Sequence, residues 1–228
     1  MPPVELLYQY RIPDWIVRRA IRWILRRSNR RWYRMPVSEQ EEHRRALIDK
    51  LRRSPIAIRT DDANRQHYEV PPSFFELVLG PWLKYSCCYW PEGVSNLEQA
   101  EEAMLRLTCE RAQIRDGMRV LDLGCGWGSL TLWIAEHYPN CQVTALSNST
   151  VQIDYIEHLA ARRGLDNVRA VVRDVNDLSL DGSFDLAVSI EMFEHVKNYG
   201  RLLAHVASLL EPGGRLFVHI FSHRQFAF

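Results

Sequence analysis

The second half of the chain alternates short apolar runs with helical patterns, and this alternation constrains the fold more than any other feature. The runs consist largely of β-branched and aliphatic residues, as expected for strands buried on both faces. They are "RVLDL" (119–123), "QVTAL" (142–146), "VRAVV" (168–172), "FDLAVSI" (184–190) and "GRLFVHIF" (214–221). Helical patterns fall between them, at about 128–137, 150–163 and 199–210. The pattern predicts an α/β fold with a doubly wound parallel sheet, whose ligand site lies at the carboxyl ends of the strands.

A turn with three glycines follows the first run. In "LDLGCGWGSL" they stand at 124, 126 and 128, which allows a ligand to approach the backbone closely. The spacing is G-x-G-x-G, whereas a dinucleotide site expects G-x-G-x-x-G. No acid follows the second strand either, so a nicotinamide-dependent oxidoreductase is disfavoured. The turn by itself leaves open both a ligand site and a plain structural turn.

Polar side chains follow the second and third strands. Asn148 and Gln152 of "SNSTVQ" can exchange hydrogen bonds with ribose hydroxyls. The alternative is that Asn148 or Ser149 caps the next helix and that Gln152 is solvated. Asp174 can accept a hydrogen bond from an exocyclic amine, or it is a turn residue.

Two carboxylates and an imidazole follow the fourth strand. Glu191, Glu194 and His195 would meet at the mouth of the sheet, where burial and like charges move pKa values toward neutrality. Such a set is suited to accepting protons. Alternatively, Glu194 caps the next helix and His195 packs against the domain. We expect no metal, because His195, His219 and His223 lack a zinc-enzyme motif.

The first 60 residues differ from the rest in charge. They hold fifteen Lys and Arg against six Asp and Glu, or +9, which leaves −8 for the remainder. After Pro13, apolar residues recur at helical spacing with arginines between them, which indicates a basic amphipathic helix. We expect its apolar face to pack on the main domain; the alternative is peripheral contact with an anionic membrane. Arg18, Arg19 and Arg22 exclude a membrane-spanning helix, and no nucleic-acid-binding motif accompanies it.

Three further helices are predicted before the alternating region. They cover residues 38–53, 73–79 and 97–113. We therefore expect three parts in the chain. These are a helical N-terminal extension (1–67), a covering segment with its leading helix (68–116) and the α/β domain (117–228). The five scattered cysteines and the absence of a signal-peptide pattern indicate a reducing, cytoplasmic compartment.

The motifs together resemble one enzyme family. The matching stretches are "HYEVPPSFFELVLGPWLKYSCCYW", "LDLGCGWGSL", "SNSTVQ", "RDV" and "EMFEHVKNY", in this order along the chain from about residue 68 to residue 228. They resemble the family that joins cyclopropane-fatty-acyl-phospholipid synthases, mycolic-acid cyclopropane synthases and plant coclaurine N-methyltransferases. These are S-adenosylmethionine-dependent one-carbon transferases. The resemblance implies a Rossmann-like class I methyltransferase fold and a sulfonium donor without a pyrophosphate, which explains the short glycine spacing.

The resemblance also implies roles for individual residues. The expected donor-binding residues divide by the part of the donor that they contact. Gly124 and Gly126 hold the methionine part, Asn148 and Gln152 reach the ribose, Asp174 and Val175 meet the adenine, Tyr85 and Ser86 close over the donor, and Ile190 completes the set. Glu191, Glu194 and His195 resemble the acids and histidine that serve the acceptor amine.

Two branches of the family suggest different reactions. In the N-methyltransferase branch a small amine is methylated, and the glutamate at position 191 is typical of that branch. Synthases usually carry a small residue there and bind a bicarbonate ion through residues that correspond to Cys87, Glu194 and His195. We favour methylation of an amine over cyclopropanation of a lipid acyl chain, although the basic N-terminal helix suits a lipid substrate.

The family's sheet has two more strands after the fifth, with inserted helices that roof the substrate pocket. This chain stops at Phe228. We therefore expect a donor pocket with weak or absent turnover, or a protein that binds the donor without catalysis.

Overall fold

The computed structural model describes residues 12–58 and 71–222. It divides the chain into two compact units, of which the first reaches Lys50 and the second spans Leu51–Ser222. The first unit contains helix α2 (Asp14–Tyr33) and most of helix α3 (Val37–Arg53). Both helices confirm their sequence-based predictions, and neither meets the length and apolar character that a bilayer-crossing helix needs, nor does any other helix in the described ranges.

Helix α2 is amphipathic in the predicted way. Asp14 opens its first turn and pairs with Arg18 at 2.6 Å, one helical turn further on. The indole rings of Trp15 and Trp23 are more than half exposed. The packing of this apolar face on the α/β domain stays a prediction.

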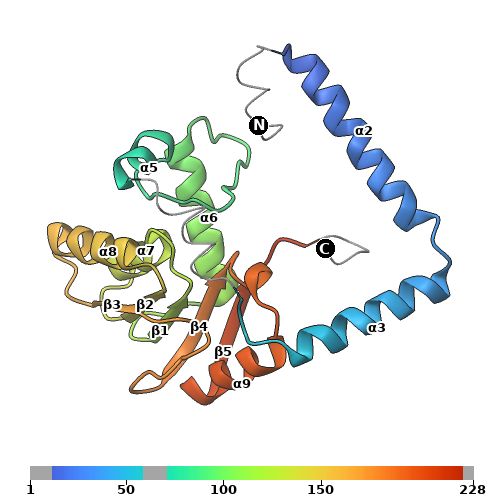
Figure 1. Cartoon of the computed structure of the whole chain (residues 1–228). Coiled ribbons are helices and arrows are strands. Elements are labelled where there is room, and N and C mark those ends of the chain that lie inside the picture. Colours follow the sequence, from blue (N-terminus) through green and yellow to red (C-terminus); the bar gives the residue numbers. More distant parts are fainter. Residues whose placement is uncertain (1–11, 59–70, 223–228) are drawn as a thin grey trace. The chain divides into compact units, whose positions relative to one another are not determined.

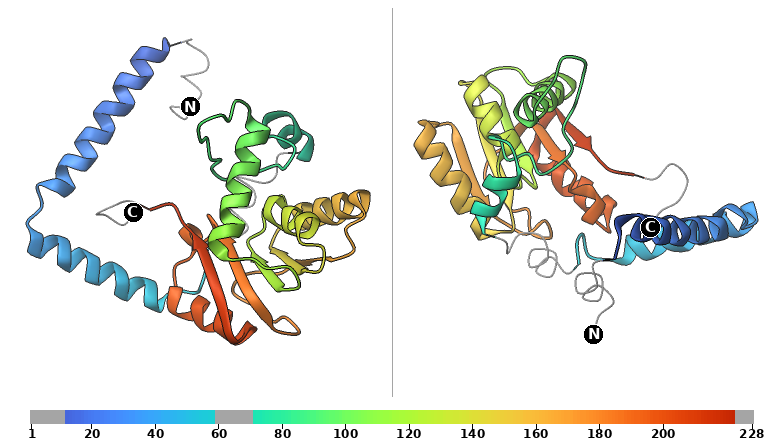
Figure 2. Two further views of the ribbon diagram at one scale, coloured as in Figure 1. Left: turned by 180° about the vertical axis from the view of Figure 1, so that it is seen from behind. Right: turned by 90° about the horizontal axis from the view of Figure 1, so that it is seen from above.

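A five-stranded parallel sheet forms the centre of the second unit (Figure 1). Its order is β3-β2-β1-β4-β5, with all four neighbouring pairs parallel. The strands are β1 (Arg119–Leu123), β2 (Gln142–Ser147), β3 (Val168–Val172), β4 (Phe184–Ile190) and β5 (Leu210–His219). In Figure 2, left, β4 and β5 lie side by side in orange and red. The predicted α/β sheet is therefore confirmed.

Strand β5 is the one whose predicted bounds are wrong by several residues. It begins at Leu210, four residues before the predicted start, and ends at His219 instead of residue 221. A register shift explains the early start. Leu210 pairs with Phe184, and the ladder then resumes where Arg215 pairs with Leu186. The apolar pattern begins only after this irregularity, so the sequence conceals the first residues of the strand.

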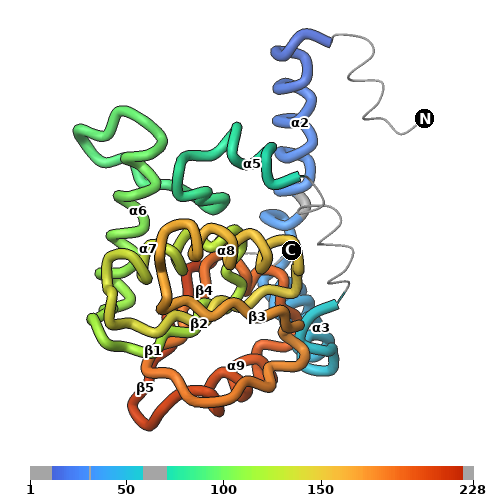
Figure 3. Tube along the Cα trace, turned by 90° about the vertical axis from the view of Figure 1, so that its left-hand side faces the viewer, coloured from blue at the N-terminus to red at the C-terminus, as the bar shows by residue number. Residues whose placement is uncertain are grey.

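Helices cover both faces of the sheet (Figure 3). Helices α7 and α8 lie over one face and α9 over the other, while α6 contacts α7. The helices of this unit are α5 (Pro72–Val78), α6 (Leu97–Ala112), α7 (Ser129–His137), α8 (Thr150–Arg163) and α9 (Tyr199–Leu209), with a short 3-10 helix η1 (Phe193–His195).

Strand β1 shows why the apolar runs are nearly continuous. Val120 belongs to the core beneath α6 and α7, together with Trp133. Its neighbour Leu121 belongs to the core on the α9 side, together with Leu202. Successive side chains point to opposite faces, and both faces are buried here, so nearly every position in the strand must be apolar.

A glycine at the start of α7 allows α7 and α8 to pack closely. Gly128 is the N-cap of α7 with φ +80°, in the left-handed region. A Cβ atom at this position would lie 2.6 Å from Cγ1 of Ile156 on α8. Gly164, which ends α8, has φ +67° but no heavy atom within 4 Å of such a Cβ. A side chain at Gly164 would therefore cause backbone strain alone, whereas one at Gly128 would cause both backbone strain and steric overlap.

Replacing these glycines by alanine is predicted to have unequal effects. Gly164→Ala should lower the free energy of unfolding by about 1–2 kcal/mol, the cost of a left-handed alanine. Gly128→Ala should cost a further 1–3 kcal/mol or so, because Ile156 must also move. Urea unfolding followed by circular dichroism measures both. Equal losses in the two variants would contradict the packing explanation.

Candidate active site

A cavity of about 560 Å³ opens at the carboxyl ends of the strands. Residues that follow β1, β2, β3 and β4 line it, which places it beside the β1–β4 boundary where the strand order reverses. Ligands of doubly wound sheets bind at such a point. The position of the predicted site is thus the position of a real cavity.

Four unpaired polar atoms indicate a ligand-binding role for this cavity. Within the described ranges, four buried side-chain nitrogen or oxygen atoms lack a hydrogen-bond partner, and all four belong to residues that line this cavity. They are Nε1 of Trp127, Oγ of Ser129, Nε2 of Gln152 and Oε2 of Glu194. A buried polar atom without a partner costs about 1–3 kcal/mol. Their concentration in one cavity gives a polar ligand several groups to bind.

The glycine turn leaves room for that ligand. Gly124 and Gly126 both have positive φ angles, +83° and +56°. A Cβ atom on Gly124 would lie 2.7 Å from Cγ of Met192, whereas one on Gly126 would meet nothing within 4 Å. Both glycines line the cavity. Gly126 is therefore the point where a ligand can approach the backbone, and the interpretation as a plain structural turn is not needed.

Gln152 has one bonded and one unbonded end. Its Oε1 accepts a hydrogen bond from Oγ of Ser147 at 2.7 Å, which fixes the amide and leaves Nε2 without a partner among the described residues. The side chain is 2% exposed. Ser149 caps α8, because its Oγ accepts a hydrogen bond from the backbone N–H of Gln152 at 3.4 Å. The capping alternative is thus right for Ser149, but a solvated Gln152 is wrong.

Lys84 contributes a buried cation that the sequence analysis missed. The residue is 5% exposed, lines the cavity and donates through Nζ to Oγ of Ser86. Within the described ranges it forms no ion pair with a carboxylate. Burial lowers the pKa of Lys84, while the nearby Cys87, Cys88 and Glu191 oppose that change. An anionic group in the cavity would stabilise its charged form.

A buried glutamate holds the segment that carries Lys84. Glu101 of α6 is fully buried, and its carboxylate accepts hydrogen bonds from the backbone N–H groups of Gly80, Trp82 and Lys84 at 3.0–3.1 Å. The same segment continues to Tyr85 and Ser86, which line the cavity as predicted. Glu101 is therefore a positioning residue for this wall of the cavity.

Asp122, at the end of β1, is buried in the wall of the cavity. It is 2% exposed, and its Oδ2 accepts a hydrogen bond from Oγ1 of Thr131 at 2.7 Å. Burial raises the pKa of Asp122 to about 6, although the bonds to Thr131 and the charge of Lys84 act in the opposite direction. A carboxylate with a raised pKa is destabilised when it ionises.

The acids after β4 are placed differently from one another. Glu191 has φ +51°, a left-handed angle, and its N–H donates to the carbonyl oxygen of His219 at 2.8 Å. Glu194 lies in η1; its Oε1 accepts from the backbone N–H of Phe221, and its Oε2 is one of the unpaired atoms. His195 is exposed and lines the cavity. All three expected acceptor-side residues thus face one cavity.

The alternatives for Glu194 and His195 are wrong. Helix α9 is capped by Asn198, whose Oδ1 accepts from the backbone N–H of Arg201 at 3.1 Å, so Glu194 is not its cap. His195 is exposed and does not pack into the core.

Two predicted site residues lie outside the cavity wall. Oδ1 of Asp174 accepts from the N and Nδ2 atoms of Asn176 at 2.7 Å each, the bonding of a turn residue. Cys87 lies with Glu191 and His219. His219 was not foreseen as its neighbour, and the expected grouping of Cys87 with Glu194 and His195 stays a prediction. The remaining predicted donor-binding residues line the cavity, namely Tyr85, Ser86, Gly124, Gly126, Asn148, Gln152, Val175 and Ile190.

The buried Asp122 predicts a specific pH dependence of stability. Its pKa rises from an ordinary 3.8 to about 6 on folding, so the folded state is favoured below pH 4 and that contribution is lost as the pH rises through 6. Asp122→Asn removes the ionisation. The stability of the variant relative to the unchanged protein should rise by about 2.4 kcal/mol between pH 4 and pH 8. Denaturant unfolding at both pH values measures it, and a pH-independent difference would contradict the burial of this charge.

Comparison with known proteins supports this architecture. Residues 57–226 match the family model described as mycolic acid cyclopropane synthetase. A (S)-coclaurine N-methyltransferase from Thalictrum flavum subsp. glaucum is 39% identical over 228 residues, which is 99% of this chain and 63% of that protein. The cyclopropane-fatty-acyl-phospholipid synthase of Escherichia coli (strain K12) is 40% identical over 159 residues, 68% of this chain and 39% of that protein.

A solved structure extends the comparison to three dimensions. A crystal structure of coclaurine N-methyltransferase bound to N-methylheliamine and S-adenosylhomocysteine matches with a TM-score of 0.92 and 41% identity. The match covers 99% of this chain and 66% of that one. The chain thus spans slightly less than two thirds of these N-methyltransferase relatives. The similarity includes the N-terminal helices, because both matches cover 99% of this chain.

Proposed function

The chain belongs to the mycolic acid cyclopropane synthetase family, and on that premise we propose that it transfers a methyl group from S-adenosylmethionine to the nitrogen of a small amine. The observation that carries this proposal is the convergence of four unpaired polar atoms on one cavity at the strand ends. Relatives that are N-methyltransferases support the acceptor class.

The donor half of the cavity suits an amino-acid nucleoside. The buried ammonium group of Lys84 is available to the carboxylate of the methionine part, and Nε2 of Gln152 is available to a ribose hydroxyl. Asn148 lines the same wall, and Gly126 leaves space beside the backbone. The bound donor would supply an already activated methyl group. The residues of this chain then have to orient it and exclude water.

The acceptor half supplies proton acceptors. An ammonium substrate must lose a proton before its nitrogen can attack, and Oε2 of Glu194 has no other partner among the described residues. Glu191 and His195 border the same cavity and can stabilise a cationic amine or take up the proton. Asp174 accepts hydrogen bonds within its turn, and we also propose that it contacts the adenine of the donor.

Cyclopropanation of an unsaturated acyl chain is the second candidate, because the Escherichia coli synthase is 40% identical over 68% of this chain. Donor binding with weak or absent catalysis is the third candidate function.

We also propose that the chain has three parts, at residues 1–67, 68–116 and 117–228. A reducing cytoplasmic location is proposed too, and the five free cysteines support it. We further propose that α2 makes peripheral contact with a membrane.

Removing the Lys84 charge is predicted to weaken binding of ligands that carry the carboxylate. In calorimetric titrations, Lys84→Met should weaken S-adenosylhomocysteine binding by about tenfold or more, the effect of one charge-assisted hydrogen bond. Binding of 5′-methylthioadenosine, which lacks the amino-acid part, should change little. Equal weakening of both ligands would refute the role of Lys84. Absence of binding to the folded, unchanged protein would refute the proposed function.

The acceptor class can be tested with a labelled donor. Methyl label should enter a panel of secondary and tertiary amines and not unsaturated phospholipid. Glu194→Gln should lower the rate by about 100-fold or more, because a proton acceptor is lost, with little change in S-adenosylhomocysteine affinity. Glu157→Gln, an exposed change on α8, is the matched control. Label in the lipid fraction would favour the synthase candidate instead.

A further inference from the structure

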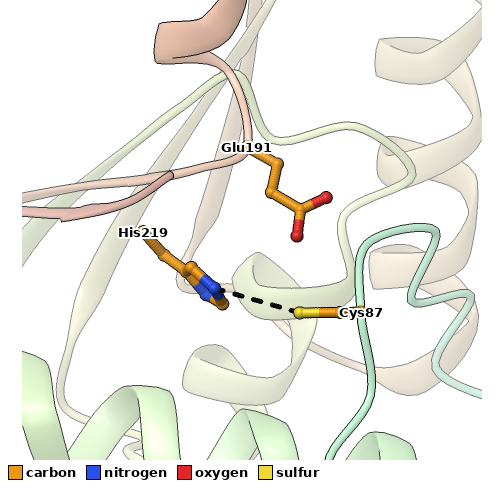
Figure 4. A group of neighbouring side chains, drawn as sticks. All are labelled: Cys87, Glu191 and His219. Carbon is orange, nitrogen blue, oxygen red and sulfur yellow. Dashed lines mark hydrogen bonds between the residues drawn. The ribbon is translucent and has the colours of Figure 1, made fainter. Parts of the chain in front are cut away.

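Three potential metal ligands of different chemistry meet beside the candidate active site. Cys87, Glu191 and His219 each offer one ligand atom, and these atoms lie within 4.8 Å of one another. Sγ of Cys87 is 3.9 Å from Nε2 of His219. Figure 4 shows the three side chains pointing toward one another. They come from segments far apart in the sequence, so no sequence motif contains all three.

The backbone holds two of these ligands side by side. Ile190 and His219 are register partners across β4 and β5, and the N–H of Glu191 donates to the carbonyl oxygen of His219. The left-handed φ of Glu191 therefore occurs beside the β5 ligand. Cys87 follows the segment whose N–H groups bind Glu101. Backbone hydrogen bonds therefore hold the segments that carry these three side chains.

The donor set selects the class of ion. A thiolate and an imidazole favour zinc-class cations over magnesium or calcium, and a carboxylate completes a set found in zinc proteins. Zinc bond lengths place two ligand atoms of one tetrahedral site about 3.5 Å apart. The observed separations, which are 4.8 Å or less, exceed this by up to about 1.3 Å, which side-chain rotations can supply. Three protein ligands leave a fourth position for water.

We propose that Cys87, Glu191 and His219 form a binding site for a zinc-class divalent cation, and that the bound ion inhibits methyl transfer. Binding makes bonds from the ion to sulfur, oxygen and nitrogen; the thiol proton of Cys87 leaves to solvent, and no group changes oxidation state. The inhibition rests on the proposed function, because Glu191 cannot hold an ion and an amine together. The positive charge of Lys84 opposes binding of the cation, whereas the negative charges of the Cys87 thiolate and the Glu191 carboxylate favour it.

The matched pair of neighbouring cysteines gives a sharp test. Cys88 is a half-buried neighbour outside the cluster, so Cys88→Ser is the control for Cys87→Ser. Zinc affinity is measured by competition with a chromophoric chelator on metal-free, untagged full chain. Cys87→Ser and His219→Asn should each weaken it more than about tenfold, and Cys88→Ser should not. With saturating cobalt in place of zinc, a thiolate-to-cobalt charge-transfer band should appear; it should be lost in Cys87→Ser and kept in Cys88→Ser.

The outcomes separate this site from the donor site. Unchanged zinc affinity in Cys87→Ser, or no zinc binding by protein shown to be folded by circular dichroism, would overturn the metal site. S-adenosylhomocysteine titration of the same metal-free preparation tests the donor pocket independently. If zinc binds at Cys87 but does not slow methylation by an otherwise active preparation, the inhibition is overturned and the binding site stands.

Discussion

The wall of the active-site cavity depends on one buried carboxylate. Glu101 is fully buried, and three backbone N–H groups of residues 80–84 converge on it. That segment has almost no regular secondary structure, so its N–H groups need such an acceptor. The three bonds in turn offset the cost of burying the carboxylate. The position of Lys84, and of the residues that follow it as far as Cys87, therefore traces back to a side chain on α6 that does not line the cavity.

The cavity contains both a buried cation and carboxylates. Lys84 is the buried cation, and an anionic part of a ligand would be favoured beside it. Glu191 and Glu194 belong to the β4 side, where a cationic amine would be favoured. In a partly desolvated cavity such fixed charges act more strongly than they would in water. A ligand pair of one anionic and one cationic portion fits this distribution.

The sequence predicted the sheet well and the site in part, for physical reasons. Strands buried on both faces, such as β1, leave short apolar runs bounded by turn residues, and this length favours strands over helices. The residues after each strand, such as Gln152, could be assigned because parallel strands end at one edge of the sheet. Lys84 and Glu101 could not, since their roles arise from packing between distant segments. For the same reason His219 was not foreseen as a neighbour of Cys87, because the β4–β5 pairing places His219 beside Glu191.

The backbone at Glu191 has an evolutionary consequence. A left-handed non-glycine residue costs about 1–2 kcal/mol, whereas glycine adopts this angle freely. Even alanine would not avoid that cost, because it has the Cβ atom that causes it. Glutamate at this position therefore exchanges folding stability for a carboxylate at the cavity. Such a substitution persists only in a background with stability to spare, so compensating substitutions elsewhere in the domain would have had to precede or accompany it.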